Sequence, residues 1–220
     1  ELVPQALAVP GDPSSAAFPA VGAILSPDAE VTLQNVCLNP LRTGLYETLR
    51  EMGADISFTN EKEAAGETVA DVVVRSSDLR GVDVPPERSA SMIDEYPVLG
   101  AAAACASGTT RLHGLGELRL KESDRLSAMA QGLAACGVTV RETADGIEIE
   151  GTGQPPQGGA HIVTDFDHRV AMAFLVLGAV TAEPVTVDDD SSIATSFPDF
   201  VPLMNGLGAR IAPAMGAAAR

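Results

Sequence analysis

The segment Leu133-Ala134-Ala135-Cys136-Gly137-Val138-Thr139-Val140 has two counterparts in the chain, Leu49-Arg50-Glu51-Met52-Gly53-Ala54-Asp55-Ile56 and Met204-Asn205-Gly206-Leu207-Gly208-Ala209-Arg210-Ile211. Each copy reads as the end of a helix, a glycine just beyond it, and then a strand. Glycine at that position adopts the left-handed conformation without a Cβ clash. Apolar residues stand four and eight positions before each glycine, which is the spacing of one buried helix face.

A second match lies earlier in each copy, where an apolar, small-residue helix is followed by a β-rich stretch. These helices are expected at Phe18–Ala23, Tyr96–Ala101 and Phe174–Ala179. The strands that follow are expected at Val31–Leu33, Thr109–Leu112 and Val185–Val187, with further strands at Val72–Val74 and Ile147–Ile149. The pattern predicts three copies of about 70 residues in an α/β fold whose helices are enclosed by sheets.

Two stretches between the copies are expected to be irregular. Thr59–Thr68 is polar and charged, and Gly151–Gly159 is rich in turn residues. Neither is long enough to be a clear domain linker, so the sequence indicates one domain.

Composition excludes several classes of protein. The chain has 220 residues, with 14 Lys and Arg against 30 Asp and Glu, a formal net charge of −16. Such an acidic chain is unsuited to nucleic acid or to anionic lipid. The longest apolar run, Val170–Val180, is roughly half of the ~20 residues that a membrane helix needs. We therefore expect no nucleic-acid partner and no membrane span.

Cysteine usage and the start of the chain indicate a cytoplasmic protein. Cys37, Cys105 and Cys136 are an odd number in unrelated spacings, and buried free thiols are the simplest interpretation. Glu1–Pro4 lacks the basic start and apolar run of a signal peptide. The chain has no Cys-x-x-Cys or His-x-x-x-His pair, which argues against zinc.

The stretch Lys121-Glu122-Ser123-Asp124-Arg125 is the most informative for chemistry. The spacing predicts Lys121 and Arg125 on one helix face, with Glu122 also within reach of Arg125. Cations at a helix N-terminus oppose its macrodipole, so either local carboxylates or a bound anion should offset them. Arg169 also begins a buried helix, and two such arginines in an acidic protein suggest a focused anion site.

Other polar residues allow more than one interpretation. Asp94 precedes an apolar helix, where it could cap the helix or act as a general base. His168 is more consistent with a structural hydrogen bond than with catalysis. The run Asp188–Asp190 is better explained as a solvated turn than as a metal site, because no further spaced carboxylates complete one.

Four motifs in order resemble the 3-phosphoshikimate 1-carboxyvinyltransferase family, and the resemblance covers essentially the whole chain. They are Pro10–Phe18, Lys121–Leu126, Asp167–Met172 and Ala194–Phe200. The resemblance implies an inside-out α/β barrel in which each domain has three βαβαββ repeats. It implies that residues 1–220 form one such domain, with repeats at about 8–78, 88–150 and 160–213, and that a partner N-terminal domain is absent.

The resemblance also implies an activity and the residues that perform it. The family transfers the carboxyvinyl group of phosphoenolpyruvate to the 5-hydroxyl of shikimate 3-phosphate and releases phosphate. Asp94 then matches the proton acceptor at the hydroxyl, and Glu122 matches the carboxyl that handles the methyl-group proton. Lys121 matches a contact to shikimate 3-phosphate, and Arg125 and Arg169 match the arginines that hold phosphoenolpyruvate. No metal and no organic cofactor is implied, and the chain is expected to be inactive without the other domain.

One departure and two alternatives accompany this resemblance. Thr195 stands where many family members have a lysine that contacts phosphoenolpyruvate. One alternative is an enzyme like UDP-N-acetylglucosamine carboxyvinyltransferase, which shares the fold but lacks the two arginine-bearing motifs. The other is a non-catalytic binding domain, although such a descendant would have no reason to keep all five site residues.

Overall fold

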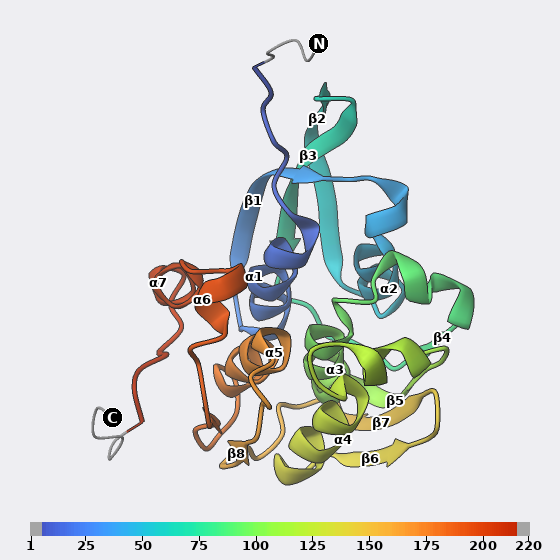
Figure 1. Cartoon of the computed structure of the whole chain (residues 1–220), viewed down its shortest axis with the longest axis vertical. Coiled ribbons are helices and arrows are strands. Elements are labelled where there is room, and N and C mark those ends of the chain that lie inside the picture. Colours follow the sequence, from blue (N-terminus) through green and yellow to red (C-terminus); the bar gives the residue numbers. More distant parts are fainter. Residues whose placement is uncertain (1–5, 215–220) are drawn as a thin grey trace.

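The computed structural model describes residues 6–214, which form an α/β fold of helices enclosed by three sheets (Figure 1). The longer helices are α1 (Pro13–Leu25), α2 (Gly44–Glu51), α3 (Tyr96–Cys105), α4 (Arg125–Ala135), α5 (His168–Gly178) and α7 (Phe200–Gly206), with the short α6 at Ile193–Ser196. The short 3-10 helices are η1 (Pro40–Arg42), η2 (Pro86–Ser91) and η3 (Gly116–Leu120). The strands are β1 (Glu30–Cys37), β2 (Asp55–Ala64), β3 (Glu67–Arg75), β4 (Asp83–Val84), β5 (Ser107–Leu112), β6 (Thr139–Glu142), β7 (Ile147–Thr152), β8 (His161–Ile162) and β9 (Thr186–Val187).

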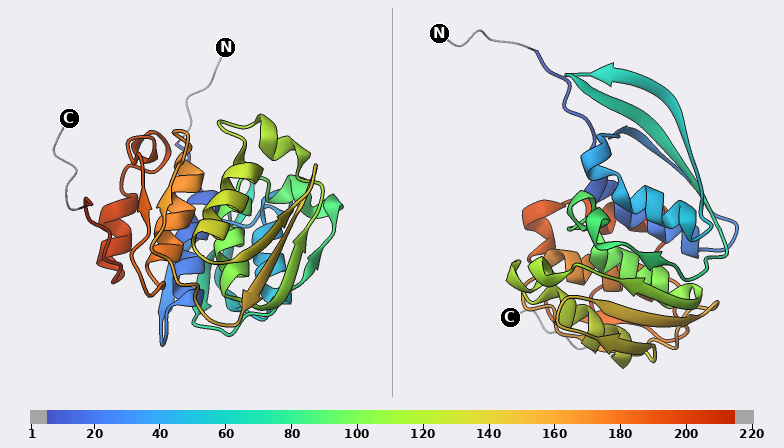
Figure 2. Two further views of the ribbon diagram at one scale, coloured as in Figure 1. Left: turned by 90° about the horizontal axis from the view of Figure 1, so that it is seen from below. Right: turned by 90° about the vertical axis from the view of Figure 1, so that its right-hand side faces the viewer.

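Three helices, α1, α3 and α5, pack on one another in the interior (Figure 2). Every residue of α3 is buried, including the run Gly100–Ala104. Small side chains let neighbouring backbones approach closely, which suits a helix buried on all sides. The strands β1 and β3 contact α1, and β7 contacts α3. The predicted enclosure of helices by sheets is confirmed.

In each copy, the extended segment before the first helix pairs in parallel with the strand that follows that helix. The second copy has the sheet order β4-β5-β7-β6, and the first has β1-β3-β2. In the first copy a parallel bridge between Gly11 and Val36 stands where β4 pairs with β5. The third copy has the parallel pair β8-β9. The first two copies therefore follow the βαβαββ pattern.

The three glycine-terminated helices end in the same way, as their sequences predicted. Gly53, Gly137 and Gly208 all have positive φ. The residue after each glycine donates its N–H to the carbonyl of the apolar residue four before that glycine, and the distances are 2.9, 3.0 and 3.0 Å. This is the closure of a Schellman motif, which satisfies carbonyls at a helix C-terminus.

The prediction of an irregular Thr59–Thr68 was wrong. Strands β2 and β3 pair from Asp55 to Ala64, and Ala65 and Gly66, both with positive φ, turn the chain between them. Two left-handed residues in a two-residue loop match the twist of a hairpin. The hairpin extends beyond the helices (Figure 2), so its polar sequence reflects exposure and not irregularity.

The strand expected after Gly208 is also not formed. In the first two copies the strand after the glycine pairs with β3 or β7. Within residues 6–214 the third copy has no such partner strand. The side chain of Asn205 instead bonds both backbone groups of Ile211, at 2.8 and 2.9 Å. The segment thus satisfies its backbone without a sheet.

Candidate functional site

Carboxylates stand at the N-termini of the helices that carry the site. Asp167 caps α5 by accepting from the N–H groups of Arg169 and Val170, at 2.9 and 3.2 Å. Asp124 caps α4 by accepting from the N–H of Ser127 at 3.0 Å. Both caps complement the positive end of a helix dipole. They account for the start of each helix immediately after an aspartate.

The guanidinium of Arg125 is fully buried and binds three carboxylates. Its Nε donates to Asp167 at 2.7 Å, and its Nη1 donates to Asp94 at 3.1 Å. Its Nη2 donates to Glu122. A buried charge is tolerated only when it is paired in this way. The sequence left open whether carboxylates or a bound anion balance this cation, and in the structure it is the carboxylates.

Asp94 gathers three cations around one carboxylate. Besides Arg125, Arg169 Nη2 lies 3.5 Å from Oδ2 and Lys121 Nζ lies 3.7 Å from Oδ1. Burial acts to raise the pKa of Asp94, but the charges of Arg169, Lys121 and Arg125 outweigh it and hold the pKa below its usual range. The side chain is 32% exposed. Asp94 is therefore an ionised carboxylate that remains open to a ligand.

Lys121 and Glu122 lie at the outer side of this cluster, but not on a helix. Lys121 follows η3 with extended backbone, and α4 begins only at Arg125. The prediction that Lys121 and Arg125 share one helix face was therefore wrong, because the cap at Asp124 sets the start of α4. The two cations meet instead at Asp94. Glu122 remains 51% exposed, although it binds Arg125.

Two acidic residues of the site were not recognised in the sequence. Asp167 has no exposed surface, and Ser123 donates to it at 3.2 Å in addition to Arg125. Glu95 is 3% exposed and accepts from the hydroxyl of Ser14. Two features of the sequence could have indicated them. Asp167 lies at the cap position before α5, and Glu95 lies directly before the wholly apolar helix α3.

The other polar residues singled out in the sequence are His168, Asp188 and Thr195. Burial and the charge of Arg169 lower the pKa of His168. Asp188 accepts from the N–H and hydroxyl of Thr164, at 2.9 and 2.7 Å. Thr195 donates its hydroxyl to the Ser192 carbonyl at 2.6 Å. The contacts of Asp188 explain it as part of a turn.

Among residues 6–214, no group of three or more His, Cys, Asp and Glu side chains is arranged to hold a metal ion. All three cysteines are free, and Cys105 and Cys136 are buried, whereas Cys37 is only half-buried. No helix in the described part of the chain is long and apolar enough to cross a membrane.

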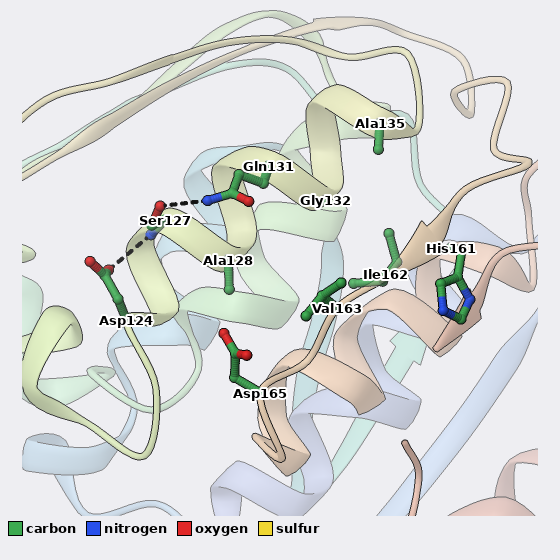
Figure 3. A pocket seen from close by; sticks show the side chains of 10 residues that line it. All are labelled: Asp124, Ser127, Ala128, Gln131, Gly132, Ala135, His161, Ile162, Val163 and Asp165. Carbon is green, nitrogen blue, oxygen red and sulfur yellow. Dashed lines mark hydrogen bonds between the residues drawn. The ribbon is translucent and has the colours of Figure 1, made fainter. Parts of the chain in front are cut away.

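A groove of about 430 Å³ lies beside α4 (Figure 3). It is lined by Asp124, Ser127, Ala128, Gln131, Gly132, Ala135, His161, Ile162, Val163 and Asp165. The lining contains two carboxylates and none of the site's Lys or Arg side chains, so it does not suit an anionic ligand. The cluster around Asp94 is the better candidate site.

The chain is similar in sequence to one described family and to curated proteins. The sequence profile of a family described as EPSP synthase (3-phosphoshikimate 1-carboxyvinyltransferase) matches residues 1–204. A curated relative from Paramagnetospirillum magneticum, named 3-phosphoshikimate 1-carboxyvinyltransferase, is 64% identical over 96% of this chain and 47% of its own length. One of the same name from Rhodospirillum rubrum is 60% identical over the same shares. The chain spans about half the length of the curated relatives it matches.

Solved structures show the same likeness. EPSP synthase from Acinetobacter baumannii superposes with a TM-score of 0.89 at 44% identity, over 92% of this chain and 47% of that one. The enolpyruvyl transferase NikO from Streptomyces tendae superposes with a TM-score of 0.72 at 18% identity, over 92% of this chain and 44% of that one. The second likeness concerns the fold alone.

Proposed function

This chain belongs to the EPSP synthase family, and we propose that it forms one half of a two-part active site that joins phosphoenolpyruvate to shikimate 3-phosphate. The proposed reaction transfers the carboxyvinyl group to the 5-hydroxyl and releases phosphate. The repeats at about 8–78, 88–150 and 160–213 then form one domain, and a partner N-terminal domain supplies the rest of the site.

The placement of two carboxylates beside three cations carries this proposal. Asp94 is held ionised by Arg125, Arg169 and Lys121, whereas Glu122 has one cation partner and is half-exposed. Carboxylates in unlike surroundings can perform unlike acid–base tasks. The cations suit a carboxylate and two phosphates.

In the addition step, the 5-hydroxyl oxygen forms a bond to C2 of phosphoenolpyruvate. Asp94 takes the hydroxyl proton, and Glu122 gives a proton to the methylene carbon. In the elimination step, the bond from C2 to the phosphate oxygen breaks and Glu122 takes a proton back from the methyl carbon. The double bond is restored, and phosphate leaves with the proton that Asp94 took from the hydroxyl, which returns Asp94 to its carboxylate form.

The arginines and Lys121 position the substrates in this proposal. Arg169 is 15% exposed and can donate to the carboxylate of phosphoenolpyruvate when Asp94 turns toward the hydroxyl. Arg125 is fully buried against carboxylates, so it holds those carboxylates in place and reaches ligand only if they shift. Lys121 lies beside Asp94 and faces the phosphate of shikimate 3-phosphate. Three free cysteines support a cytoplasmic location.

Phosphate release tests the proposal. This chain is assayed alone and also joined to the N-terminal half of the Paramagnetospirillum magneticum relative, with phosphoenolpyruvate and shikimate 3-phosphate as substrates. We expect turnover only from the joined protein. Turnover by the chain alone contradicts the half-site, and turnover only with UDP-N-acetylglucosamine as acceptor contradicts the substrate.

A further inference from the structure

Asp94 and Glu95 are consecutive carboxylates that reach different parts of the molecule. Asp94 contacts Arg125, the first residue of α4, and Arg169, the second residue of α5. Glu95 accepts a hydrogen bond from Ser14, in the first turn of α1. The dipeptide at the start of α3 therefore joins all three copies of the repeat at one point.

The contacts of Glu95 form an ordered chain. Arg42 Nη2 donates to the hydroxyl oxygen of Ser14 at 2.9 Å. A hydroxyl has one proton, so Ser14 donates that proton to Glu95. Arg42 Nη2 also lies 3.9 Å from the Glu95 carboxylate. The direction of each hydrogen bond is fixed by the donor types alone.

The backbone N–H and carbonyl of Glu95 are hydrogen-bonded as well. Its N–H donates to the Met92 carbonyl at 3.0 Å, and its carbonyl accepts from the Leu99 N–H at 2.9 Å. An apolar side chain of similar volume would fill the same space without the cost of burying a carboxyl group. Packing alone therefore does not account for a glutamate here.

We propose that Glu95 is a positioning residue for Asp94: tied to the first repeat by Ser14 and Arg42, it fixes the turn from which the Asp94 carboxylate meets its cations. The proposed function enters only in giving Asp94 an acid–base role. The position that Glu95 gives to Asp94 is a property of this chain and can be tested without measuring turnover.

Charged and titratable groups surround this pair from several elements. Glu95 faces Ser14 from α1, Arg42 from η1, Tyr46 from α2, Asp94 and Arg169. Asp94 faces Arg169, Lys121 and Arg125. Burial raises the pKa of Glu95 against the opposing effects of Ser14, Arg169 and Arg42. Removal of Glu95 therefore changes two things for Asp94, its anchor and its like-charged neighbour.

Three substitutions distinguish the hydrogen bond that Glu95 accepts from Ser14 from the negative charge of Glu95. Glu95→Gln retains an oxygen that accepts from Ser14 but removes the charge. Glu95→Ala removes both. Ser14→Ala breaks the tie to α1 and leaves the Glu95 carboxyl in place. Glu61→Gln, on the exposed face of β2, is the control for loss of one carboxyl group.

The pKa of Asp94 is measured in each variant by NMR titration of its carboxyl carbon in the 220-residue chain. We expect Glu95→Ala to raise it by about one unit, because the cations then meet Asp94 less closely. Ser14→Ala should raise it too, and Glu61→Gln should leave it unchanged. Glu95→Gln should leave it equal or lower, because the anchor persists without the like charge.

Other outcomes overturn the proposal. Equal shifts in Glu95→Ala and Glu95→Gln mean that Glu95 acts by charge alone. If the pKa of Asp94 is unchanged in Glu95→Ala and in Glu95→Gln while their Tm falls, then Glu95 only holds α1 to α3. If Glu95→Ala does not fold, an unchanged pKa in Ser14→Ala decides against the proposal. Absence of turnover in the protein joined to the N-terminal half contradicts the proposed function and leaves this result intact.

Discussion

Arg125 Nε donates to Asp167 Oδ2 across 2.7 Å, and neither side chain exposes any surface to solvent. The pair joins the first residue of α4 to the residue that caps α5. It therefore fixes the relative position of two helices from different repeats directly behind the candidate site. Its loss should be visible in stability before it is visible in chemistry.

Asp167→Asn should destabilise the chain by about 3 kcal/mol or more, because one partner of a buried charge pair is removed. Asparagine still caps a helix, so the cap of α5 is retained and the charge is isolated as the cause. Urea unfolding measures the change. Asp165→Asn, at an exposed position, is the matched control and should change stability by less than about 0.5 kcal/mol. Equal losses in the two variants would contradict the importance of the pair.

Gly132→Ala should destabilise the contact between α4 and α5. A Cβ at Gly132 would overlap the ring of Phe174, whereas a Cβ at Gly206 would meet no heavy atom within 4 Å. Overpacking a core costs about 1–3 kcal/mol, which exceeds or cancels the gain in helix propensity. Thermal unfolding of Gly132→Ala and Gly206→Ala measures the difference. A stable Gly132→Ala would show that this packing is looser than the structure indicates.

The sequence predicted the repeated elements because local sequence features set the boundaries of each repeat. The helix faces ending at Leu49, Leu133 and Met204 and the glycines that follow need no distant partner. The hairpin Thr59–Thr68 was missed because its polar residues are exposed on both faces, so no alternation marks it. The strand after Gly208 was expected by analogy, and it fails because strands depend on a pairing partner elsewhere.

The sequence singled out residues that the fold brings together, but it did not predict their contacts. Asp94, Lys121, Glu122, Arg125 and Arg169 were all singled out. Lys121, Arg125 and Arg169 converge on Asp94, and Glu122 binds Arg125. That Arg125 is wholly buried could not be read from its neighbours. Its carboxylate Asp167 lies 42 positions away, and only the fold brings the two together.

Glu95→Gln should gain stability relative to the unmodified chain as pH rises. Burial raises the pKa of Glu95 above its usual 4.5, so the folded state holds this proton more tightly than the unfolded state. The contribution of Glu95 to stability is therefore greatest in acid and is lost as pH rises through the raised pKa. The difference in unfolding free energy between the two proteins, measured from about pH 4.5 to pH 7, should move steadily in favour of the variant. Asp94 titrates in both proteins and largely cancels, and a difference independent of pH would show that Glu95 titrates normally.

Arg169→Ala and Arg125→Ala should differ although both remove an arginine from the site. Arg169 is partly exposed, so its loss should weaken phosphoenolpyruvate binding in the joined protein by ~10- to 150-fold, as expected for one charge-assisted pair. Arg125 is fully buried, so its loss should also lower the unfolding free energy of this chain. Titration of phosphoenolpyruvate and urea unfolding measure the two effects. Normal KM and kcat in Arg169→Ala would reduce that residue to a partner of Asp94.

Glu122→Gln and Asp94→Asn separate the two proposed acid–base roles in the joined protein. Glu122 contacts only Arg125 and is half-exposed, so Gln keeps its size and its hydrogen bond but cannot deliver a proton to carbon. We expect kcat to fall by ~10²–10⁴-fold with shikimate 3-phosphate affinity nearly unchanged. Asp94→Asn should lower kcat by a similar factor and also weaken shikimate 3-phosphate binding, because the carboxylate that accepts from the hydroxyl is lost.

The comparison depends on measuring kcat and shikimate 3-phosphate affinity separately in each variant. Both substitutions replace a carboxyl group of the same cluster with an amide of nearly the same size, so each serves as the control for the other. Near-normal kcat in Glu122→Gln would leave Glu122 as a salt-bridge partner of Arg125 and would move the carbon proton to another group. Identical profiles in the two variants would mean that the cluster responds to its total charge, and the assignment of separate protons to Asp94 and Glu122 would then be wrong.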